Sequence, residues 1–263
     1  MKGRKSGFTL VEVSLFLAVT ALLFLGVTLG VRGSVFQQRY TDSVQNFAEF
    51  LRTAYAETMN VEHAGSGRSE QAIYGKMITF GETFDLSGTR IPDGENRVFS
   101  YTVVGNLGEI SSGDVIGTLK DMGANVAIRE GSSYKLAGIA QEYIPRWGAG
   151  IQTTAAYSSG YRPFKGTLLI VRHPRSGTVY TYYYDATIEV NSVMKSGDET
   201  AKKNLLINKL NTTNFKVKEL DFCINPLGVA KSDTRRDVRL VENARNASGV
   251  EIINQDSTEN KCK

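Results

Sequence analysis

Residues 7–31 read GFTLVEVSLFLAVTALLFLGVTLGV, an almost purely apolar stretch with a single carboxylate near its start. A hydrocarbon core of about 30 Å is crossed by roughly 20 helical residues, so this stretch predicts a membrane-spanning helix with some tilt. Lys2, Arg4 and Lys5 precede it and should stay on the cytoplasmic side, which places the bulk of the chain outside. The stretch is longer than the apolar region of a secretory signal, and no small-residue cleavage site closes it. We therefore expect a retained helix.

Glu12 is the one residue of this stretch that a simple anchor does not explain. A bare carboxylate in lipid costs on the order of a few kcal/mol, so it needs a partner. If the chain were cut before Phe8, the new α-amino group would lie about one helical turn from Glu12. That amine could neutralise Glu12 in the same chain or in a neighbouring one. The alternative is a glutamate that snorkels to the headgroups at the helix end.

The residues Gly7-Phe8-Thr9-Leu10-Val11-Glu12 follow a short basic leader and precede the apolar helix. In this they resemble the class III signal of type IV pilins and type II secretion pseudopilins. The resemblance implies that a prepilin peptidase cuts between Gly7 and Phe8 and methylates the new amino group of Phe8. It also implies that Glu12 guides docking into a growing filament, with other pilin or pseudopilin subunits and an inner-membrane assembly platform as partners. The family often has a proline near the twenty-second mature position, where this chain has Leu29, so a kink there is not implied.

After the apolar stretch, residues 32–62 contain no proline, and apolar residues recur at the three-and-four spacing of one helical face. We expect one long helix whose first half lies in lipid or a filament core and whose second half packs on a head. Gly65-Ser66-Gly67 should end it. The predicted division is a leader at 1–7, a transmembrane or filament-core helix at 8–31, its amphipathic half at 32–64 and a β-rich globular head at 65–263. The predicted packing stripe is Val44, Phe47, Ala48, Leu51, Ala54, Tyr55 and Thr58.

Beyond Gly67 the pattern changes to short β-prone segments that glycine turns separate. The fold class is therefore α+β: a long N-terminal helix packed on a mainly antiparallel β-sheet head, which is the pilin fold that the resemblance implies. Strands are predicted at 72–80, 97–104, 125–129, 167–173 and 178–190, a short helix within 192–210, and closing strands at 216–225, 236–241 and 250–254.

The clearest hairpin is GTLLIVRHPRSGTVYTYYYDATIEV, because Pro174 to Gly177 supplies a turn between two β-prone runs. Its tyrosines could form a stacking surface for nucleic acid or sugar. Alternate tyrosines that cover the two faces of the sheet are the better explanation. Further on, KELDFCINPLG, RRDVRLVENARN and SGVEII loosely resemble the C-terminal end of H-type pseudopilins and their minor-pilin relatives.

Composition and motifs favour neither catalysis nor a cofactor. The balance of 31 Lys and Arg against 27 Asp and Glu gives no general reason to invoke nucleic acid or an anionic surface. Only His63 and His173 could act as imidazole bases, and the second precedes Pro174 in a turn, which is typical of a solvated residue. The GxSxG, HExxH, GxxxxGK[ST] and GxGxxG motifs do not occur. We expect no enzyme activity, no cofactor and no metal.

The two cysteines, Cys223 and Cys262, lie late in the chain and outside any CxxC pair. They could be free core thiols, but a domain outside the membrane would most naturally join them in one disulfide that pins the C-terminal tail. In the pilin family a C-terminal disulfide commonly bounds a variable surface region, and the spacing is compatible with that role.

A basic cluster near the C-terminal strands comprises Lys231, Arg235, Arg236, Arg239 and Arg245. Some minor pilins contact DNA through such arginines, so Arg235, Arg236 and Arg239 are candidate DNA-binding residues. Asp233, Asp237 and Glu242 interleave with them, which an ordinary solvated strand face explains better.

Three interpretations of the whole chain follow. The first is a structural subunit, minor because of its large head, of a type IV pilus or type II secretion pseudopilus. It would be stored as a single-pass inner-membrane protein and assembled into a periplasmic or cell-surface filament. The second keeps the anchor but makes the head a DNA- or surface-binding module for competence or adhesion. The third is a single-span ectodomain protein that is never processed.

Overall fold

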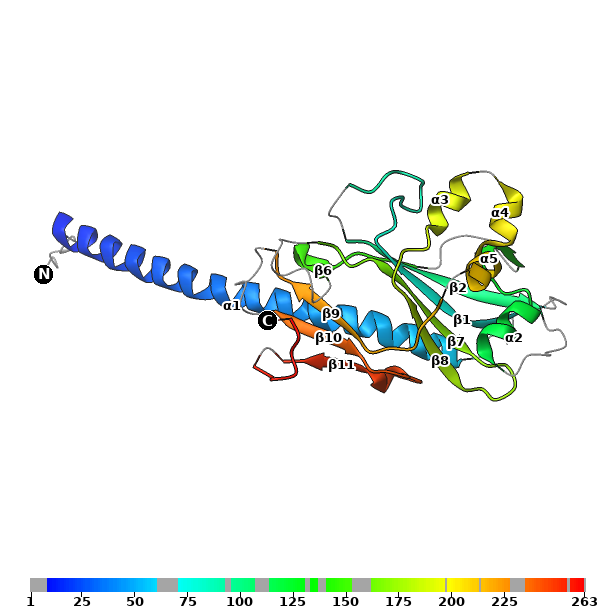
Figure 1. Cartoon of the computed structure of the whole chain (residues 1–263). Helices are drawn as coiled ribbons and strands as arrows, with labels where there is room; N and C mark the ends of the chain where they lie inside the picture. The colour runs from blue at the N-terminus through cyan, green and yellow to red at the C-terminus, as the bar shows by residue number, and fades with distance from the viewer. Residues whose placement is uncertain are drawn as a thin grey trace, which may run out of the picture.

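The computed structural model of the chain describes residues 9–60, 71–92, 96–106, 114–130, 133–136, 141–152, 162–196, 198–212, 214–227, 235–254 and 256–262. Figure 1 shows a long N-terminal helix, α1, that projects from a β-rich head and continues along it. The fold is therefore α+β with antiparallel sheets, as the sequence predicted.

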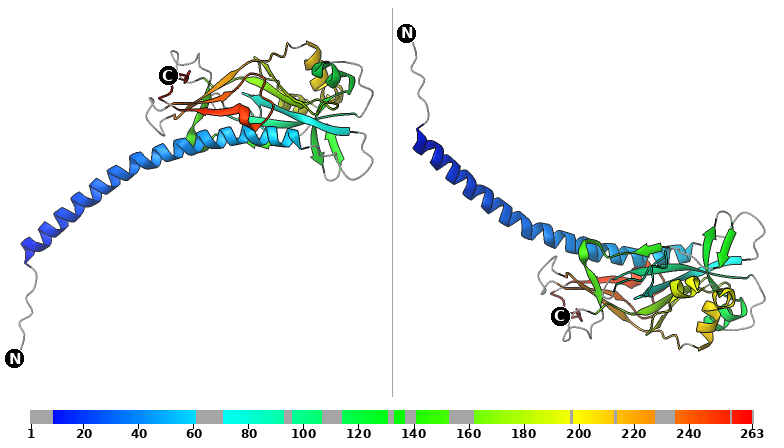
Figure 2. Two further views of the ribbon diagram at one scale, coloured as in Figure 1. Left: turned by 90° about the horizontal axis from the view of Figure 1, so that it is seen from below. Right: turned by 90° about the horizontal axis from the view of Figure 1, so that it is seen from above.

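Helix α1 (Leu10–Met59) is one element of 50 residues, about 75 Å long at the standard helical rise. Thr9 is its N-cap, and the Asn60 backbone N–H closes it by donating to the carbonyl oxygen of Ala56. Figure 2 shows a smooth curve over the whole length, as expected for a long helix without proline. The predicted stop at 65–67 lies outside the described residues.

The second half of α1 packs on the head through the predicted stripe. All seven stripe residues are buried, whereas Glu49 and Glu57 on the opposite side are exposed. Tyr40 is the first buried residue in the described part of the helix. The stripe prediction is therefore confirmed. Helical periodicity and the burial of apolar side chains were enough to make it.

The larger sheet has seven strands, all paired antiparallel, in the order β4-β3-β2-β1-β7-β8. Strand β5 is off this path and pairs with the start of β2, while β3 pairs further along the same strand. The bounds are β1 (Gln71–Phe80), β2 (Val98–Asn106), β3 (Asn125–Glu130), β4 (Ser133–Leu136), β5 (Gln141–Tyr143), β7 (Gly166–Arg172) and β8 (Val179–Tyr184).

The smaller sheet has four antiparallel strands in the order β11-β10-β9-β6 and lies beside α1 near the C-terminus (Figure 1). Its strands are β6 (Gly150–Gln152), β9 (Leu220–Asn225), β10 (Arg236–Leu240) and β11 (Val250–Ile253). The short helices are η1 (Arg146–Gly148), α2 (Val115–Asp121), α3 (Val190–Lys195), α4 (Glu199–Lys203), α5 (Leu205–Thr212) and η4 (Ala247–Gly249).

Two hydrophobic cores hold the head together. The first lies between α1 and both sheets, where Phe47, Phe80 and Phe222 meet with ring centroids 5.3 to 6.4 Å apart. The second lies on the other face of the larger sheet, which α2, α3 and α5 cover. Strand β8 serves both cores, because Tyr183 points into the first while Tyr180, Tyr182 and Tyr184 pack against the second. This arrangement confirms that the tyrosines cover both faces of the sheet.

Most predicted elements are present, with local differences. Strand β8 ends at Tyr184, before the predicted 190, because a turn leads into α3. The helix predicted within 192–210 is three short helices, and β9 begins at Leu220 rather than 216. The sequence did not predict α2, β4, β5 or β6. These elements are short, and strands of three or four residues carry too few positions for a periodic signal.

Candidate functional site: the apolar helix and the end of the head that it leaves

Glu12 folds back on the first turn of α1. Its Oε2 accepts hydrogen bonds from the backbone N and Oγ1 of Thr9, at 2.8 and 2.9 Å, and the Glu12 N–H donates to Thr9 Oγ1 at 3.3 Å. This is a capping box, which satisfies backbone donors at a helix start. Gly7 and Phe8, the predicted cleavage pair, lie outside the described residues. The carboxylate is thus held at the end of the helix that faces the predicted cleavage position.

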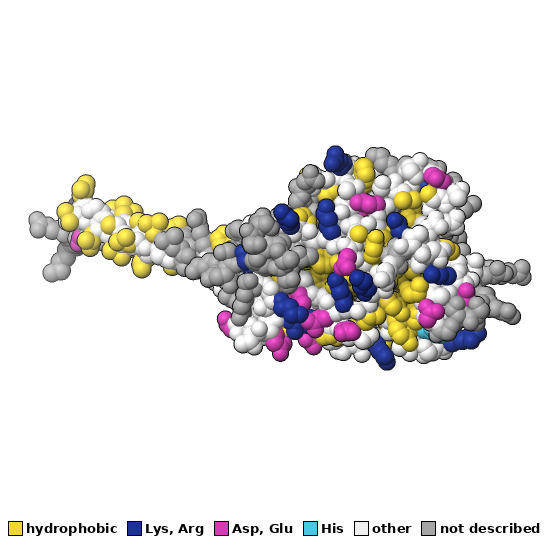
Figure 3. Space-filling model, in the orientation of Figure 1, with side chains coloured by type: hydrophobic (Ala, Val, Ile, Leu, Met, Phe, Trp, Pro, Cys, Tyr) yellow, Lys and Arg dark blue, Asp and Glu magenta, His cyan; other side chains and the backbone are white. Residues whose placement is uncertain are grey.

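The helix from Leu10 to Val27 is long and apolar enough to span a membrane, and none of it is buried against the rest of the chain. Its large apolar side chains point in all directions; Leu10, Phe16 and Phe24 are 86%, 68% and 72% exposed. Figure 3 shows this apolar surface along the projecting helix. A helix that is apolar all round belongs in lipid or among other helices, whereas an amphipathic helix would lie on a surface.

Residues from η1 and β10 lie against α1 at the level where the helix leaves the head. The Tyr40 hydroxyl donates to the carbonyl oxygen of Ile224 at 2.7 Å and accepts from the Arg236 N–H at 2.6 Å. The Ser43 hydroxyl donates to the carbonyl oxygen of Arg146 at 2.6 Å. These bonds fix the orientation of the head relative to the projecting helix.

We call the exposed and half-buried residues at this level the exit surface; Phe36, Ile144, Arg146 and Trp147 are exposed, and Arg39 and Arg236 are half-buried. Arg39 stacks on Trp147, with its Cζ 4.7 Å from the ring centroid. A groove of about 550 Å³ adjoins the surface along α1, and its lining includes Asp42, Glu49, Trp147 and Ile252.

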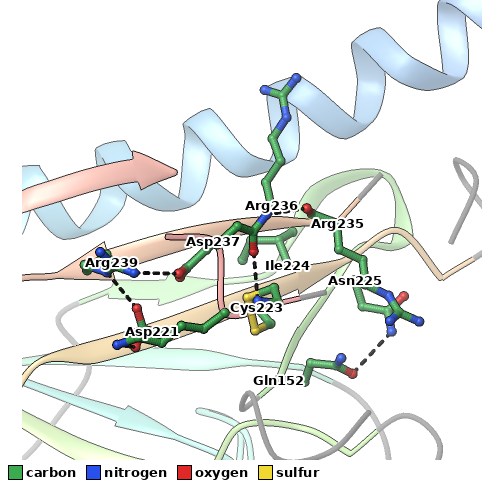
Figure 4. The surroundings of a disulfide bond; sticks show 12 residues. Gln152, Asp221, Cys223, Ile224, Asn225, Arg235, Arg236, Asp237 and Arg239 are labelled. Carbon is green, nitrogen blue, oxygen red and sulfur yellow. Dashed lines mark hydrogen bonds and ion pairs between the residues drawn. A yellow bond between two sulfur atoms is a disulfide. The ribbon is translucent and has the colours of Figure 1, made fainter. Parts of the chain in front are cut away.

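The C-terminal tail is fastened to β9 and β10. Cys223 and Cys262 are joined in a disulfide, with a Cα–Cα distance of 5.4 Å and both side chains buried. The predicted pairing of the cysteines is confirmed (Figure 4). Asp221 accepts from Arg239 Nε and from Lys261 Nζ, each at 2.8 Å, so the tail is also held by charge.

Asp237 is a buried carboxylate beside this cluster. It has no exposed side-chain surface, and within the described residues its oxygens accept no hydrogen bond. Arg239 Nη2 lies 3.6 Å from its Oδ2. Burial, together with the negative charge of Asp221, raises the pKa of Asp237 to about 7. Although burial of Asp221 acts in the opposite sense, hydrogen bonds from Lys261 and Arg239 lower the pKa of that carboxyl.

The three candidate DNA-binding arginines do not form one patch. Arg239 is only 8% exposed and pairs with Asp221, Asp237, Glu219 and Glu259, because β10 turns it toward the acidic side of the sheet. Figure 4 shows Arg236 directed toward α1 and Arg235 directed away from it. Of the wider basic cluster, Arg245 is exposed and Lys231 lies outside the described residues.

Glu82 is a second buried carboxyl that the sequence analysis did not single out. Its oxygens accept hydrogen bonds from Thr79 and Tyr101 and from the Asn191 N–H. Burial raises its pKa to about 7, although these bonds act in the opposite sense. His173, as predicted, is a turn residue whose Nδ1 accepts from the backbone of Arg175 and Ser176. His63 is not among the described residues.

Residues that the sequence analysis missed, notably Trp147 and Asp221, carry no local motif. The composition does give one signal, because Trp147 is the only tryptophan of the chain. Among the described residues, no group of three His, Cys, Asp or Glu side chains is arranged to hold a metal ion.

Comparison with protein-family models, with curated proteins and with solved structures gives no match to this chain.

Proposed function

We propose that the chain is a structural, minor subunit of a type IV pilus or a type II secretion pseudopilus. A prepilin peptidase cuts it between Gly7 and Phe8, and the subunit then assembles through α1. The observation that carries the proposal is the uncovered helix from Leu10 to Val27, which is apolar all round, has one carboxylate at its start and continues without a break into the head.

The two environments of this helix make assembly physically reasonable. In the membrane, lipid covers the apolar side chains, and in a bundle of like helices the same side chains are buried without lipid. Glu12 is unfavourable in both settings unless a positive charge is near. Cleavage before Phe8 would create an amine one residue from Thr9. The Glu12 carboxylate already accepts a hydrogen bond from the backbone N–H of Thr9.

The head supports a role outside the cytoplasm. A disulfide that fastens the C-terminal tail persists in an oxidising compartment, in agreement with a chain whose basic leader stays inside. A long helix that packs its second half on an antiparallel sheet is the layout expected of a pilin fold. The size of the head favours a minor subunit.

The test measures both N-terminal processing and incorporation into filaments in the native host. We expect a mature chain that begins at methylated Phe8, as measured by mass spectrometry of the intact protein. Glu12→Gln keeps the capping box, because glutamine serves at that position, but it removes the charge. We expect this variant to enter the membrane normally and to be depleted from filaments, while the control Glu49→Gln, on the exposed side of the same helix, is incorporated normally. A chain that keeps its first seven residues, or equal incorporation of both variants, would refute the proposal.

An unprocessed single-span protein is the second candidate. The observation that favours it is the capping box itself, which gives Glu12 a partner without any cleavage. In that case Glu12→Gln would behave like the parent chain and Met1 would remain. The separation of Arg235, Arg236 and Arg239 gives a DNA-binding head less support than either of these.

A further inference from the structure

Trp147 is held in an exposed position. Its side chain is 49% exposed, and its backbone adopts φ 60°, a region unfavourable to residues that carry a Cβ. The bond from Ser43 to the Arg146 carbonyl and the stacked Arg39 keep it there. A large aromatic ring fixed outside the core by a strained backbone points to a function at a surface.

The neighbours of Trp147 combine apolar surface with positive charge. Phe36 and Ile144 are 41% and 55% exposed. Within the described residues, Arg39, Arg146 and Arg236 form no ion pair, whereas Arg97 and Arg239 of the same head are both paired with carboxylates. Asp42 is the acidic residue of the adjoining groove nearest to this end of α1. Tryptophan and arginine together are the composition of a membrane interface anchor.

The distance from the apolar helix places this surface at the outer edge of the lipid headgroups. The apolar stretch at 8–31 is about 36 Å long as a helix, so crossing a core of about 30 Å requires a tilt of roughly 30°. Arg39 follows Arg32 by about 10 Å along the axis, or about 9 Å above the hydrocarbon once the helix tilts. The headgroup layer is about 5–7 Å thick on each side. Helical side chains lean toward the helix N-terminus, so the Arg39 guanidinium lies closer to this layer than the Arg39 backbone does, and the Trp147 ring centroid is 4.7 Å from it.

We propose that the exit surface rests on the lipid headgroups of the membrane that α1 spans. Trp147 and Phe36 enter the interface, and Arg39, Arg146 and Arg236 contact lipid phosphates. The inference rests on the membrane-stored state of the proposed function but does not require cleavage. It gives the stored subunit a fixed head orientation and a contact that extraction must break. Continuity with the spanning helix favours lipid over nucleic acid as the source of phosphate.

The test uses the fluorescence of Trp147, the only tryptophan, in the full-length chain reconstituted into bilayers. Phosphatidylcholine bilayers with and without phosphatidylglycerol are compared, with bromine placed near the headgroup or near the acyl-chain end. We expect strong quenching by headgroup-proximal bromine, weak quenching by deep bromine and protection from aqueous acrylamide. Equal emission in brominated and unbrominated bilayers, with free access of acrylamide, would overturn the proposal.

Arginine-to-glutamine variants test the contribution of positive charge to docking. Arg146→Gln with Arg236→Gln should weaken docking in phosphatidylglycerol bilayers by roughly fivefold for each arginine and leave it unchanged in pure phosphatidylcholine. Arg175→Gln, in the exposed turn between β7 and β8, is the matched control and should have no effect. If duplex DNA in detergent protected Trp147 from acrylamide, and brominated lipid did not quench it, the ligand of this surface would be nucleic acid and the lipid proposal would be refuted. N-terminal mass spectrometry of the same preparation reports processing separately, so loss of quenching with normal cleavage refutes only this inference.

Discussion

The buried carboxyl of Asp237 should make the stability of the head depend on pH. Its pKa is raised from 3.8 to about 7 in the folded chain. Between these values the folded state keeps a proton that the unfolded chain releases, so the contribution of this group is fully present below about pH 4 and is lost as pH rises to about 7. A difference of about 3 pKa units corresponds to roughly 4 kcal/mol, an upper limit because Arg239 offsets part of the ionised charge.

Asp237→Asn removes the titration and keeps the shape. Its amide, like the protonated carboxyl, carries no charge beside Asp221. We expect the variant to match the parent near pH 4 and to become more stable than the parent as pH rises, with the gain levelling off above pH 7 at up to about 4 kcal/mol. Denaturant unfolding of the full chain in detergent, followed by circular dichroism from pH 4 to 9, measures this. The exposed Glu251→Gln on β11 is the control.

A gain that does not change with pH would show that Asp237 is not protonated in the fold. A variant that is less stable than the parent at pH 8 would show that the ion pair with Arg239 outweighs burial. Either result refutes the reasoning.

Three further changes test the packing of the head in the same unfolding assay. Replacing Cys223 and Cys262 by alanine frees a tail closed across 39 residues and should cost roughly 4 kcal/mol, and a loss below about 1 kcal/mol would contradict a constraining role. Glu82→Gln should raise stability increasingly between pH 4 and 7, because burial raises the Glu82 pKa to about 7; a flat difference across that range would count against it. Leu51→Ala, at a fully buried stripe position, should cost about 2–5 kcal/mol, whereas Leu17→Ala on the projecting helix should leave head unfolding unchanged; equal losses would mean that the projecting helix packs on the head.

Local patterns were sufficient for α1 and for much of the head. The stripe from Val44 to Thr58 follows from helical periodicity, and the β7–β8 hairpin follows from two β-prone runs around Pro174 to Gly177. These features depend on residues close in sequence, so composition and spacing predict them. The disulfide between Cys223 and Cys262 could be anticipated because the chain contains no other cysteine.

The candidate site needed more than local pattern. Arg235, Arg236 and Arg239 are neighbours in sequence, yet the strand directs Arg236 toward α1 and turns Arg239 into a carboxylate cluster, because successive residues of a strand face opposite sides. Trp147 gains its position from Arg39 and Ser43, which are more than 100 residues away along the chain.

By itself, the sequence determined the apolar helix, the position of Glu12 at its start, the amphipathic continuation and the β-rich character of the head, because hydrophobic burial and backbone preference act locally. The tertiary structure alone decided the division into two sheets, the strand order, the burial of Asp237 and Glu82, and the stacking of Arg39 on Trp147 where α1 leaves the head. Those features arise from contacts between segments far apart in the chain, and no local pattern encodes which distant segments will meet.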